Sequence, residues 1–350
     1  MISASHNPMP DNGIKFFAHG GYKLPDQVED QIQELLNTPW DRPTGAAVGE
    51  VEYDDDWAEK SYIEHLMTSL GTDLHGLRIA VDCANGGASF LAPEAFRQAG
   101  ADAVVINAAP DGRNINDKAG STHPEQLQAL TVASEADFGV AYDGDADRCL
   151  AVDRYGNLVD GDKIMGALAV HMRDEGQLAK DTLVVTVMSN LGLILAMQEA
   201  GIKTIQTGVG DRYVLEAMLE GGYSLGGEQS GHIIAKKYAT TGDGILSSLL
   251  LARMVKESGR DLADLTGFIK RLPQTLINVG GVDRTRANTD PTVAEAVAAA
   301  EAVLGNTGRV LLRPSGTEPL VRVMVEAATQ AQADGVASRL ADVVKENLAL

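Results

Sequence analysis

The segment Phe138-Gly-Val-Ala-Tyr-Asp-Gly-Asp-Ala-Asp-Arg148 joins a short apolar strand pattern to a loop of alternating aspartates. It follows two similar apolar segments, Arg78-Ile-Ala-Val-Asp82 and Ala103-Val-Val-Ile-Asn107, and helix-like stretches separate the three. Strands that alternate with helices indicate right-handed crossovers and mostly parallel sheets. The sequence therefore predicts an α/β protein.

The same alternation continues toward the C-terminus, and 350 residues are enough for two to four domains. A polar helix is expected over Lys23–Leu36, whereas Gln274–Asp290 has the composition of a linker. We expect mixed βαβ domains followed by a smaller C-terminal α+β domain. The predicted segments are 1–70, 71–162, 163–275 and 276–350.

Charge and cysteine content exclude several classes of protein. The net charge of −20, from 49 acidic and 29 basic residues, argues against a non-specific nucleic-acid binder. Any phosphate site must therefore be locally basic. No apolar run approaches a membrane span and the start lacks a signal-peptide pattern, so a cytoplasmic protein is expected. Cys83 and Cys149 form no Cys-x-x-Cys pair and are expected to be buried thiols.

The aspartate loop is the first candidate site. Asp143, Asp145 and Asp147 alternate directly after a strand, so their oxygens can converge on one Mg²⁺, which prefers oxygen ligands. Arg148 is placed to meet a phosphate bidentately. A calcium EF-hand is excluded because Arg148 stands where its loop needs glycine. The alternative is an exposed aspartate-rich turn.

A serine loop opens the chain as Met1-Ile-Ser-Ala-Ser-His-Asn-Pro8. The Ser5 hydroxyl can carry a phosphoryl group, His6 can assist proton transfer, and Lys15 can steady phosphate oxygens or act as an acid or base. A serine that only caps a turn is the alternative. The Gly-x-Ser-x-Gly motif of hydrolases is absent.

Two later loops carry recognition chemistry. In Gly227-Glu-Gln-Ser-Gly231, the side chains of Glu228 and Ser230 can bind vicinal sugar hydroxyls. Arg313-Pro-Ser-Gly-Thr-Glu-Pro319 combines cationic, hydroxyl and backbone N–H groups as in a phosphate nest. Ordinary turns are the alternative for both. The candidate phosphate ligands are Arg313, Ser315, Gly316, Thr317 and Arg322.

With these four motifs in order, the chain resembles the α-D-phosphohexomutase superfamily. The resemblance covers essentially the whole sequence, and Gly227-Glu-Gln-Ser-Gly-His232 is most similar to the branch that acts on glucosamine phosphates. Family members carry most of a first domain ahead of the serine loop. Residues 1–70 are therefore expected to be a remnant of that domain.

The resemblance implies interconversion of glucosamine 6-phosphate and glucosamine 1-phosphate. Phosphorylated Ser5 would donate its phosphate, glucosamine 1,6-bisphosphate would be the intermediate, and one Mg²⁺ would be held by the phosphoserine and the three aspartates. The partner is a small sugar phosphate, with no nucleic acid and no membrane, and a homodimer is possible. Three alternatives stay open: phosphomannose or phosphoglucose specificity, a phosphatase with Asp143 as nucleophile, and a chain that only binds sugar phosphates.

Overall fold

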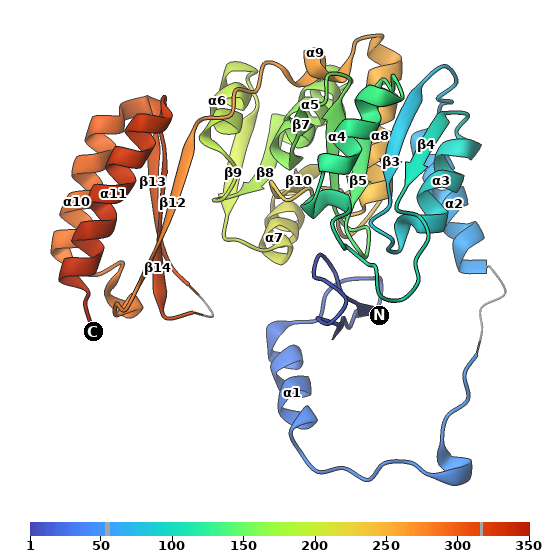
Figure 1. Cartoon of the computed structure of the whole chain (residues 1–350), viewed down its shortest axis with the longest axis horizontal. Helices are drawn as coiled ribbons and strands as arrows, with labels where there is room; N and C mark the ends of the chain where they lie inside the picture. The colour runs from blue at the N-terminus through green and yellow to red at the C-terminus, as the bar shows by residue number, and fades with distance from the viewer. Residues whose placement is uncertain (53–56, 316–317) are drawn as a thin grey trace. The chain divides into compact units, whose positions relative to one another are not determined.

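The computed structural model describes residues 1–52, 57–315 and 318–350, and its internal contacts form two compact units (Figure 1). The first unit comprises Met1–Met188 and Ala200–Phe268. The second comprises Ser189–Glu199 and Ile269–Leu350. Among the helices of the described ranges, none combines the length and the apolar character that crossing a bilayer requires.

A five-stranded sheet carries the aspartate loop in the first unit. Its order is β4-β3-β5-β6-β7, with β4, β3 and β5 parallel and the last two strands antiparallel. Strand β5 is buried along its whole length, which explains its apolar sequence. The strands are β3 (Arg78–Asp82), β4 (Asp102–Ile106), β5 (Phe138–Tyr142), β6 (Cys149–Asp153) and β7 (Leu158–Val159), and the helices before and between them are α2 (Trp57–Leu70), α3 (Ala88–Gln98) and α4 (Glu125–Ala133).

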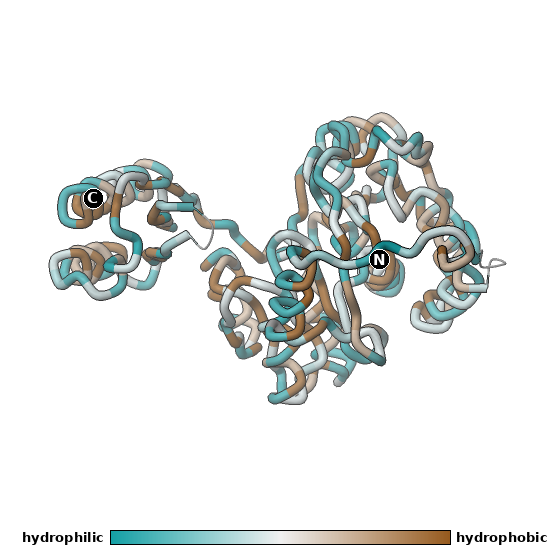
Figure 2. The backbone as a smooth tube through the Cα atoms, turned by 90° about the horizontal axis from the view of Figure 1, so that it is seen from below, coloured by the Kyte–Doolittle hydropathy of each residue, from teal (hydrophilic) through white to brown (hydrophobic). Residues whose placement is uncertain are grey.

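A four-stranded sheet carries the predicted sugar loop in the same unit. Its order is β11-β10-β8-β9, and the antiparallel pair β10–β11 holds the loop at its turn. Hydrophobic and hydrophilic stretches alternate along the chain (Figure 2). The strands are β8 (Thr182–Thr186), β9 (Lys203–Thr207), β10 (Leu225–Gly227) and β11 (Ile233–Ala235), and the helices are α5 (Gly161–Asp174), α7 (Asp211–Gly221), α8 (Gly244–Ser258) and α9 (Leu262–Thr266).

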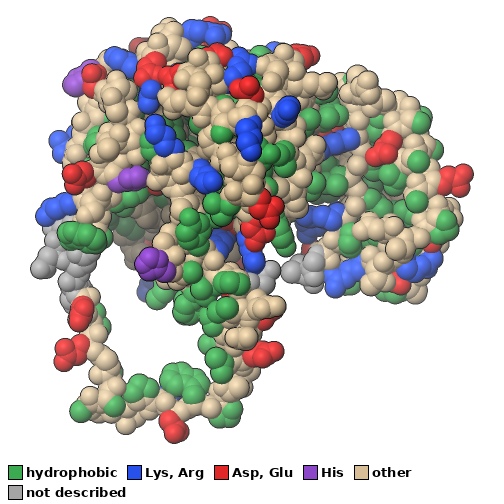
Figure 3. Space-filling view, turned by 180° about the vertical axis from the view of Figure 1, so that it is seen from behind, with side chains coloured by type: hydrophobic (Ala, Val, Ile, Leu, Met, Phe, Trp, Pro, Cys, Tyr) green, Lys and Arg blue, Asp and Glu red, His purple; other side chains and the backbone are tan. Residues whose placement is uncertain are grey.

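The N-terminal segment is a short ribbon and one helix. Strands β1 (Ile2–Ser3) and β2 (Gly13–Ile14) pair antiparallel, and α1 spans Asp26–Leu36. The helix predicted from Lys23 begins later because Pro25 disfavours helical geometry in the residue before it. Hydrophobic side chains lie on the surface of this segment (Figure 3). Ile2 is 76% exposed and Leu36 is 73% exposed.

The second unit is an antiparallel sheet covered by helices. Its order is β12-β14-β13, and alternate valines of β14 pack into a core with α11. The linker predicted over Gln274–Asp290 is wrong for its first half, because β12 pairs with β14 along its full length. The elements are α6 (Leu191–Glu199), β12 (Gln274–Gly280), α10 (Pro291–Leu304), β13 (Arg309–Pro314), β14 (Leu320–Glu326) and α11 (Gln330–Asn347).

Short 3-10 turns complete the described elements, at Gly45–Ala47, Gly120–Thr122, Ala179–Asp181, Arg284–Arg286 and Gly305–Thr307. Cys83 and Cys149 are both buried free thiols, and burial raises the pKa of Cys83 to about 12. The expectation of reduced, buried cysteines is confirmed.

Candidate active site

The serine loop lies directly on the aspartate loop. The Ser5 carbonyl accepts hydrogen bonds from the Gly144 amide at 3.0 Å and from Asn116 Nδ2 at 2.8 Å. A Cβ on Gly144 would come within 2.4 Å of that carbonyl oxygen, so only glycine permits this approach. Ser5 itself has a positive φ of 52°. Such strain in a residue other than glycine is typical of functional sites.

The three aspartates converge as the sequence predicts. Asp143, Asp145 and Asp147 each offer a carboxylate oxygen within 4.8 Å of the others. Each also has one buried oxygen with no hydrogen-bond partner among the described residues. Burial, together with the charges of Asp147 and Asp145, raises the pKa of Asp143 to about 7. Crowded oxygens without donors are what a hard dication satisfies, so these residues fit Mg²⁺.

Two cations border the carboxylates. Lys15 Nζ lies 2.5 Å from Asp145 Oδ2 and 3.6 Å from Asp147 Oδ2. Burial alone would lower the pKa of Lys15, but the hydrogen bond to Asp145 and the carboxylate charges outweigh burial and raise it. The Arg148 guanidinium lies 3.9 Å from both Asp143 and Asp147. Lys15 is therefore a fixed positive charge at this site.

His6 is a titratable group beside the candidate nucleophile. Its Nδ1 lies 3.4 Å from Ser5 Oγ. Burial, followed by the positive charge of Arg148, lowers the pKa of His6. A neutral imidazole at this distance can accept the proton of a hydroxyl, which a protonated Lys15 cannot.

The sugar loop lies against the aspartate loop. The Cys149 amide donates to the Gly231 carbonyl at 3.0 Å, and a Cβ on Gly231 would meet Cys149 backbone oxygen at 2.3 Å. Glu228 Oε1 accepts from the Gly210 amide at 3.1 Å, whereas the buried Ser230 hydroxyl has no hydrogen-bond partner within the described part of the chain. The hydrogen-bonding capacity of the Ser230 hydroxyl is therefore unused among the described residues.

Sequence reasoning missed the residues that orient the aspartates. The ring of buried His232 places Nδ1 3.5 Å from Asp147 Oδ2 and accepts from the Gly242 amide at Nε2, 2.9 Å away. Its hydrogen bond lowers the pKa of Asp147 against the effect of burial. Ser3 Oγ donates to Asp145 Oδ2 at 3.0 Å. In the sequence, His232 is only the last residue of the motif Gly227–His232, and no local pattern gives it a role.

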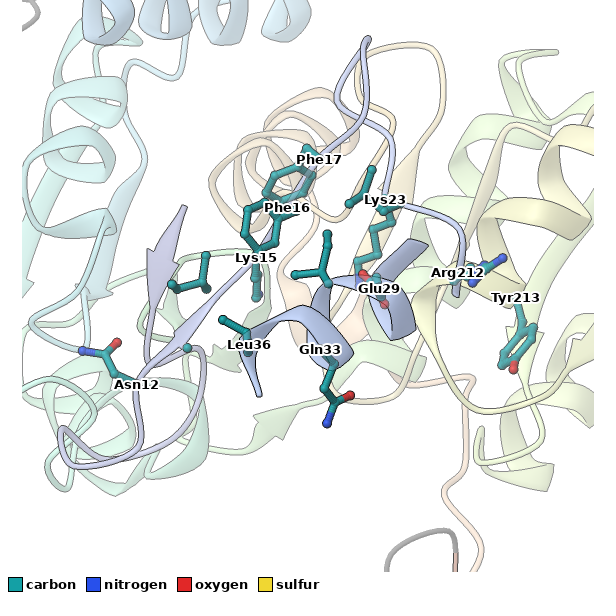
Figure 4. Close-up of a pocket in the computed structure, with 14 residues that line it drawn as sticks. Asn12, Lys15, Phe16, Phe17, Lys23, Glu29, Gln33, Leu36, Arg212 and Tyr213 are labelled. Carbon is teal, nitrogen blue, oxygen red and sulfur yellow. The ribbon is translucent and has the colours of Figure 1, made fainter. Parts of the chain in front are cut away.

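A wide pocket of about 790 Å³ opens beside Lys15 (Figure 4). The segment after β2, helix α1 and the start of α7 line it. Lys15, Lys23 and Arg212 bring three cationic side chains to its walls, and Phe16 and Phe17 add aromatic rings. Each of the three cations is paired with a carboxylate, Lys15 with Asp145, Lys23 with Asp211 and Arg212 with Glu216, so cations gather here although the chain carries a net charge of −20.

The predicted phosphate loop belongs to the second unit. Arg313 on β13 and Arg322 on β14 are direct cross-strand partners. Buried Ser315 accepts at its hydroxyl from the Glu318 amide, 3.2 Å away, and Arg284 donates to the carbonyls of both residues. Like charges at directly opposite strand positions are destabilising, and Arg322 Nη2 donates to Glu318 Oε2 at 3.1 Å. Gly316 and Thr317 lie outside the described residues.

Protein-family models match nearly the whole chain. The descriptions are phosphoglucomutase/phosphomannomutase domain I over residues 1–41, domain II over 60–156, domain III over 160–272 and the C-terminal domain over 276–343. The phosphoglucosamine mutase of Bifidobacterium longum subsp. infantis is 62% identical over 359 aligned positions, which cover 100% of this chain and 78% of the relative. The chain belongs to the phosphoglucosamine mutase family. A second member, from Kineococcus radiotolerans, is 60% identical and covers 100% and 79%.

Solved structures show the same fold. The N-acetylphosphoglucosamine mutase of Aspergillus fumigatus, in complex with GlcNAc-6P and magnesium, has a TM-score of 0.77 at 21% identity, over 99% of this chain and 88% of that chain. A phosphoglucomutase/phosphomannomutase family protein of Burkholderia thailandensis has a TM-score of 0.77 at 24% identity, over 99% and 75%.

These findings confirm the predicted α/β phosphohexomutase fold and the resemblance to this superfamily. The roles given to individual site residues remain predictions, as do the boundaries 1–70, 71–162, 163–275 and 276–350. The view of residues 1–70 as a remnant domain also remains a prediction.

Proposed function

We propose that this chain interconverts glucosamine 6-phosphate and glucosamine 1-phosphate through a phosphorylated Ser5. Relatives named phosphoglucosamine mutase, at 59–62% identity, support the substrate. The observation that carries the mechanism is the Ser5 loop held on three converging carboxylates, of which Asp143 is buried, by the Gly144 amide and Asn116. This arrangement combines a phosphoryl carrier with a cation site, as phosphoryl transfer requires.

The residues proposed for the phosphoryl transfer all lie in the first unit. The bond from phosphorus to Ser5 Oγ breaks while the free sugar hydroxyl forms a new bond to phosphorus. The hydroxyl proton passes to a neutral base, for which His6 is the candidate, and from His6 to the departing Ser5 Oγ, which lies 3.4 Å from His6 Nδ1. Lys15 keeps its proton and steadies the phosphoryl oxygens. Bound Mg²⁺, held by the three aspartates and the phosphoserine, would offset the charge of the moving group. Reversal from the other end of the 1,6-bisphosphate returns a phosphate to Ser5.

Recognition is divided between the loops. Glu228 and Ser230 are proposed to bind sugar hydroxyls, and Arg148 a phosphate. The non-reacting phosphate is assigned to the C-terminal loop, whose proposed ligands are Arg313, Ser315, Gly316, Thr317 and Arg322. The cross-strand guanidinium pair supports this assignment, because an anion between Arg313 and Arg322 would relieve their repulsion.

Gln229 bears on the choice of sugar. Its Nε2 donates to Asp162 Oδ2 on α5 at 3.0 Å, so this side chain fixes the loop that carries Glu228 and Ser230. A methionine, which related mutases of other specificity usually carry here, could not donate this hydrogen bond. Phosphomannose or phosphoglucose turnover is the alternative outcome of a substrate panel.

A phosphatase with Asp143 as nucleophile fits less well. Asp143 is fully buried, and one of its oxygens accepts from the Arg148 amide at 3.2 Å. A nucleophile needs access to the phosphorus atom in line with the leaving group. Glucosamine 1,6-bisphosphate as activator, a cytoplasmic location and a possible homodimer remain part of the proposal, and light scattering of the purified protein tests the homodimer.

The test is a coupled assay for glucosamine 1-phosphate, with Mg²⁺ and a trace of glucosamine 1,6-bisphosphate. Ser5→Ala should abolish turnover and phosphate incorporation, whereas Ser134→Ala on α4's C-terminal end should retain both. Free phosphate release by an active Ser5→Ala variant would refute the mutase mechanism. Sugar-phosphate binding without turnover in the wild type would leave only a binding protein.

A further inference from the structure

A second set of potential metal ligands lies on α5 and α8, apart from the aspartate loop. His171 and Glu175 are one helical turn apart at the end of α5, and Glu257 is near the end of α8. His171 Nε2 lies 3.5 Å from Glu175 Oε1 and 3.4 Å from Glu257 Oε2. All three ligand atoms lie within 4.8 Å of one another.

The spacing suits one small cation. Ligand atoms about 2.0–2.1 Å from a tetrahedral zinc ion are about 3.3 Å apart, close to the two separations at His171. His171 Nε2 is buried and makes no hydrogen bond within residues 1–52, 57–315 and 318–350. Carboxylate oxygens of Glu175 and Glu257 lie near this nitrogen, so the tautomer with its proton on Nδ1 would bring a ring lone pair beside two acceptor oxygens.

Neighbouring donors occupy the outer carboxylate oxygens. Arg253 Nε donates to Glu257 Oε1 at 2.8 Å, and Gln177 Nε2 donates to Glu175 Oε2 at 3.0 Å. The inner oxygens therefore turn toward His171. Arg253 Nη2 also lies 3.6 Å from Glu175 Oε1, which partly offsets the local negative charge. Outer hydrogen bonds of this kind orient metal ligands in known sites.

A cavity of about 230 Å³ borders the cluster. His171, Glu175 and Arg253 contribute to its wall, and Leu168 and Leu250 add apolar surface. An ion held by three protein ligands next to this cavity would keep a position for water or a small ligand. Imidazole with carboxylates favours zinc, whereas Mg²⁺ prefers oxygen alone.

We propose that His171, Glu175 and Glu257 form a zinc site that joins the ends of α5 and α8. The two helices begin at the catalytic loops, because Gly161 donates to the Gln229 carbonyl and Gly244 donates to the Ala146 carbonyl. With 14 residues, α5 is about 21 Å long, so the zinc site and the aspartate loop lie at opposite ends of the same helices. Zinc binding should therefore stiffen the support of the catalytic loops.

The test is titration of tag-free protein with zinc chloride, with excess Mg²⁺ to occupy the aspartate loop. The wild type should bind one zinc ion per chain, show raised thermal stability and, with cobalt(II), the absorption of a tetrahedral site. His171→Gln and Glu257→Gln should each weaken zinc binding by at least about tenfold. The control is His75→Gln, whose imidazole is 77% exposed, and it should bind zinc as the wild type does.

The outcomes separate zinc from an ion-pair network. If the wild type binds no zinc, or if folded His171→Gln and Glu257→Gln bind it as tightly as the wild type, the proposal is overturned. The cluster would then be only a polar contact between the imidazole and two carboxylates. Should one variant fail to fold, the other decides alone, because Glu257→Gln removes a charge while keeping the side-chain shape.

Discussion

Replacing Gly144 with alanine should reduce turnover strongly by displacing Ser5, while the fold loses only a modest part of its stability. The new Cβ would lie 2.4 Å from the Ser5 carbonyl oxygen, whereas ordinary contacts begin at 3.4 Å, so the serine loop must move by about 1 Å. Asn116 Nδ2, at 2.8 Å from the same Cβ, blocks a sideways escape. A displacement of this size costs about 100-fold in turnover. Overpacking costs about 1–3 kcal/mol of stability.

The assay is single-turnover transfer from labelled phosphoenzyme to glucosamine 6-phosphate, with urea unfolding measured on the same samples. Gly87→Ala is the matched control, because its Cβ would meet the Gly144 carbonyl oxygen at an ordinary 3.7 Å and its φ is −59°. It should transfer phosphate at the wild-type rate. A Gly144→Ala enzyme within about threefold of wild type would refute the view that this contact positions Ser5.

Two further predictions concern recognition and pH. Arg322→Gln should raise KM by about 10- to 100-fold, which corresponds to the loss of one hydrogen bond to a charged group. Thermal stability should fall little, because the substitution also removes the repulsion between Arg322 and Arg313. A lowered Tm with an unchanged KM would contradict this prediction. Burial raises the pKa of Asp243 despite its hydrogen bonds from Leu246 and Tyr62. The folded state then binds the extra proton, so the free energy of unfolding contributed by Asp243 is present at low pH and declines as pH rises above 3.8 through the raised folded-state pKa. In urea unfolding from pH 3.5 upward, Asp243→Asn should lack this decline, and parallel curves for the two proteins would count against it.

The sequence predicted those strands whose apolar residues form a continuous run along the chain. The apolar run of β5 ends at Asp143, and this order alone places the aspartates at the carboxyl end of a buried strand. Strand β12 was not predicted, because its composition is polar and the strand is stabilised by its pairing with β14. Propensity is a weak guide where cross-strand contacts decide the structure.

The motifs of the site were predictable from the sequence, whereas the contacts that join them were not. Asn116 lies 111 residues from Ser5 in sequence, and no local motif marks it as the donor that fixes the serine loop. His232 likewise contacts Asp147 through an approach of two loops, the isolated bridge between Arg148 and His232. Contacts of this kind depend on tertiary structure, whereas the ligand types of the aspartate loop depend on chemistry alone.

Charge explains why the separate motifs need one another. The three aspartates carry three negative charges when ionised, and Lys15 and Arg148 return two positive ones. A phosphorylated Ser5 adds about −1.5 to −2, which would leave the site strongly repulsive to an anionic substrate. Asp143, with its pKa raised to about 7, relieves part of this crowding by taking up a proton. A dication removes the need for that proton and also compensates the phosphoserine. Cation binding and Ser5 phosphorylation should therefore stabilise each other. An anionic sugar phosphate can bind only where the positive charge of the cation compensates the negative charges of the phosphoserine and the aspartates.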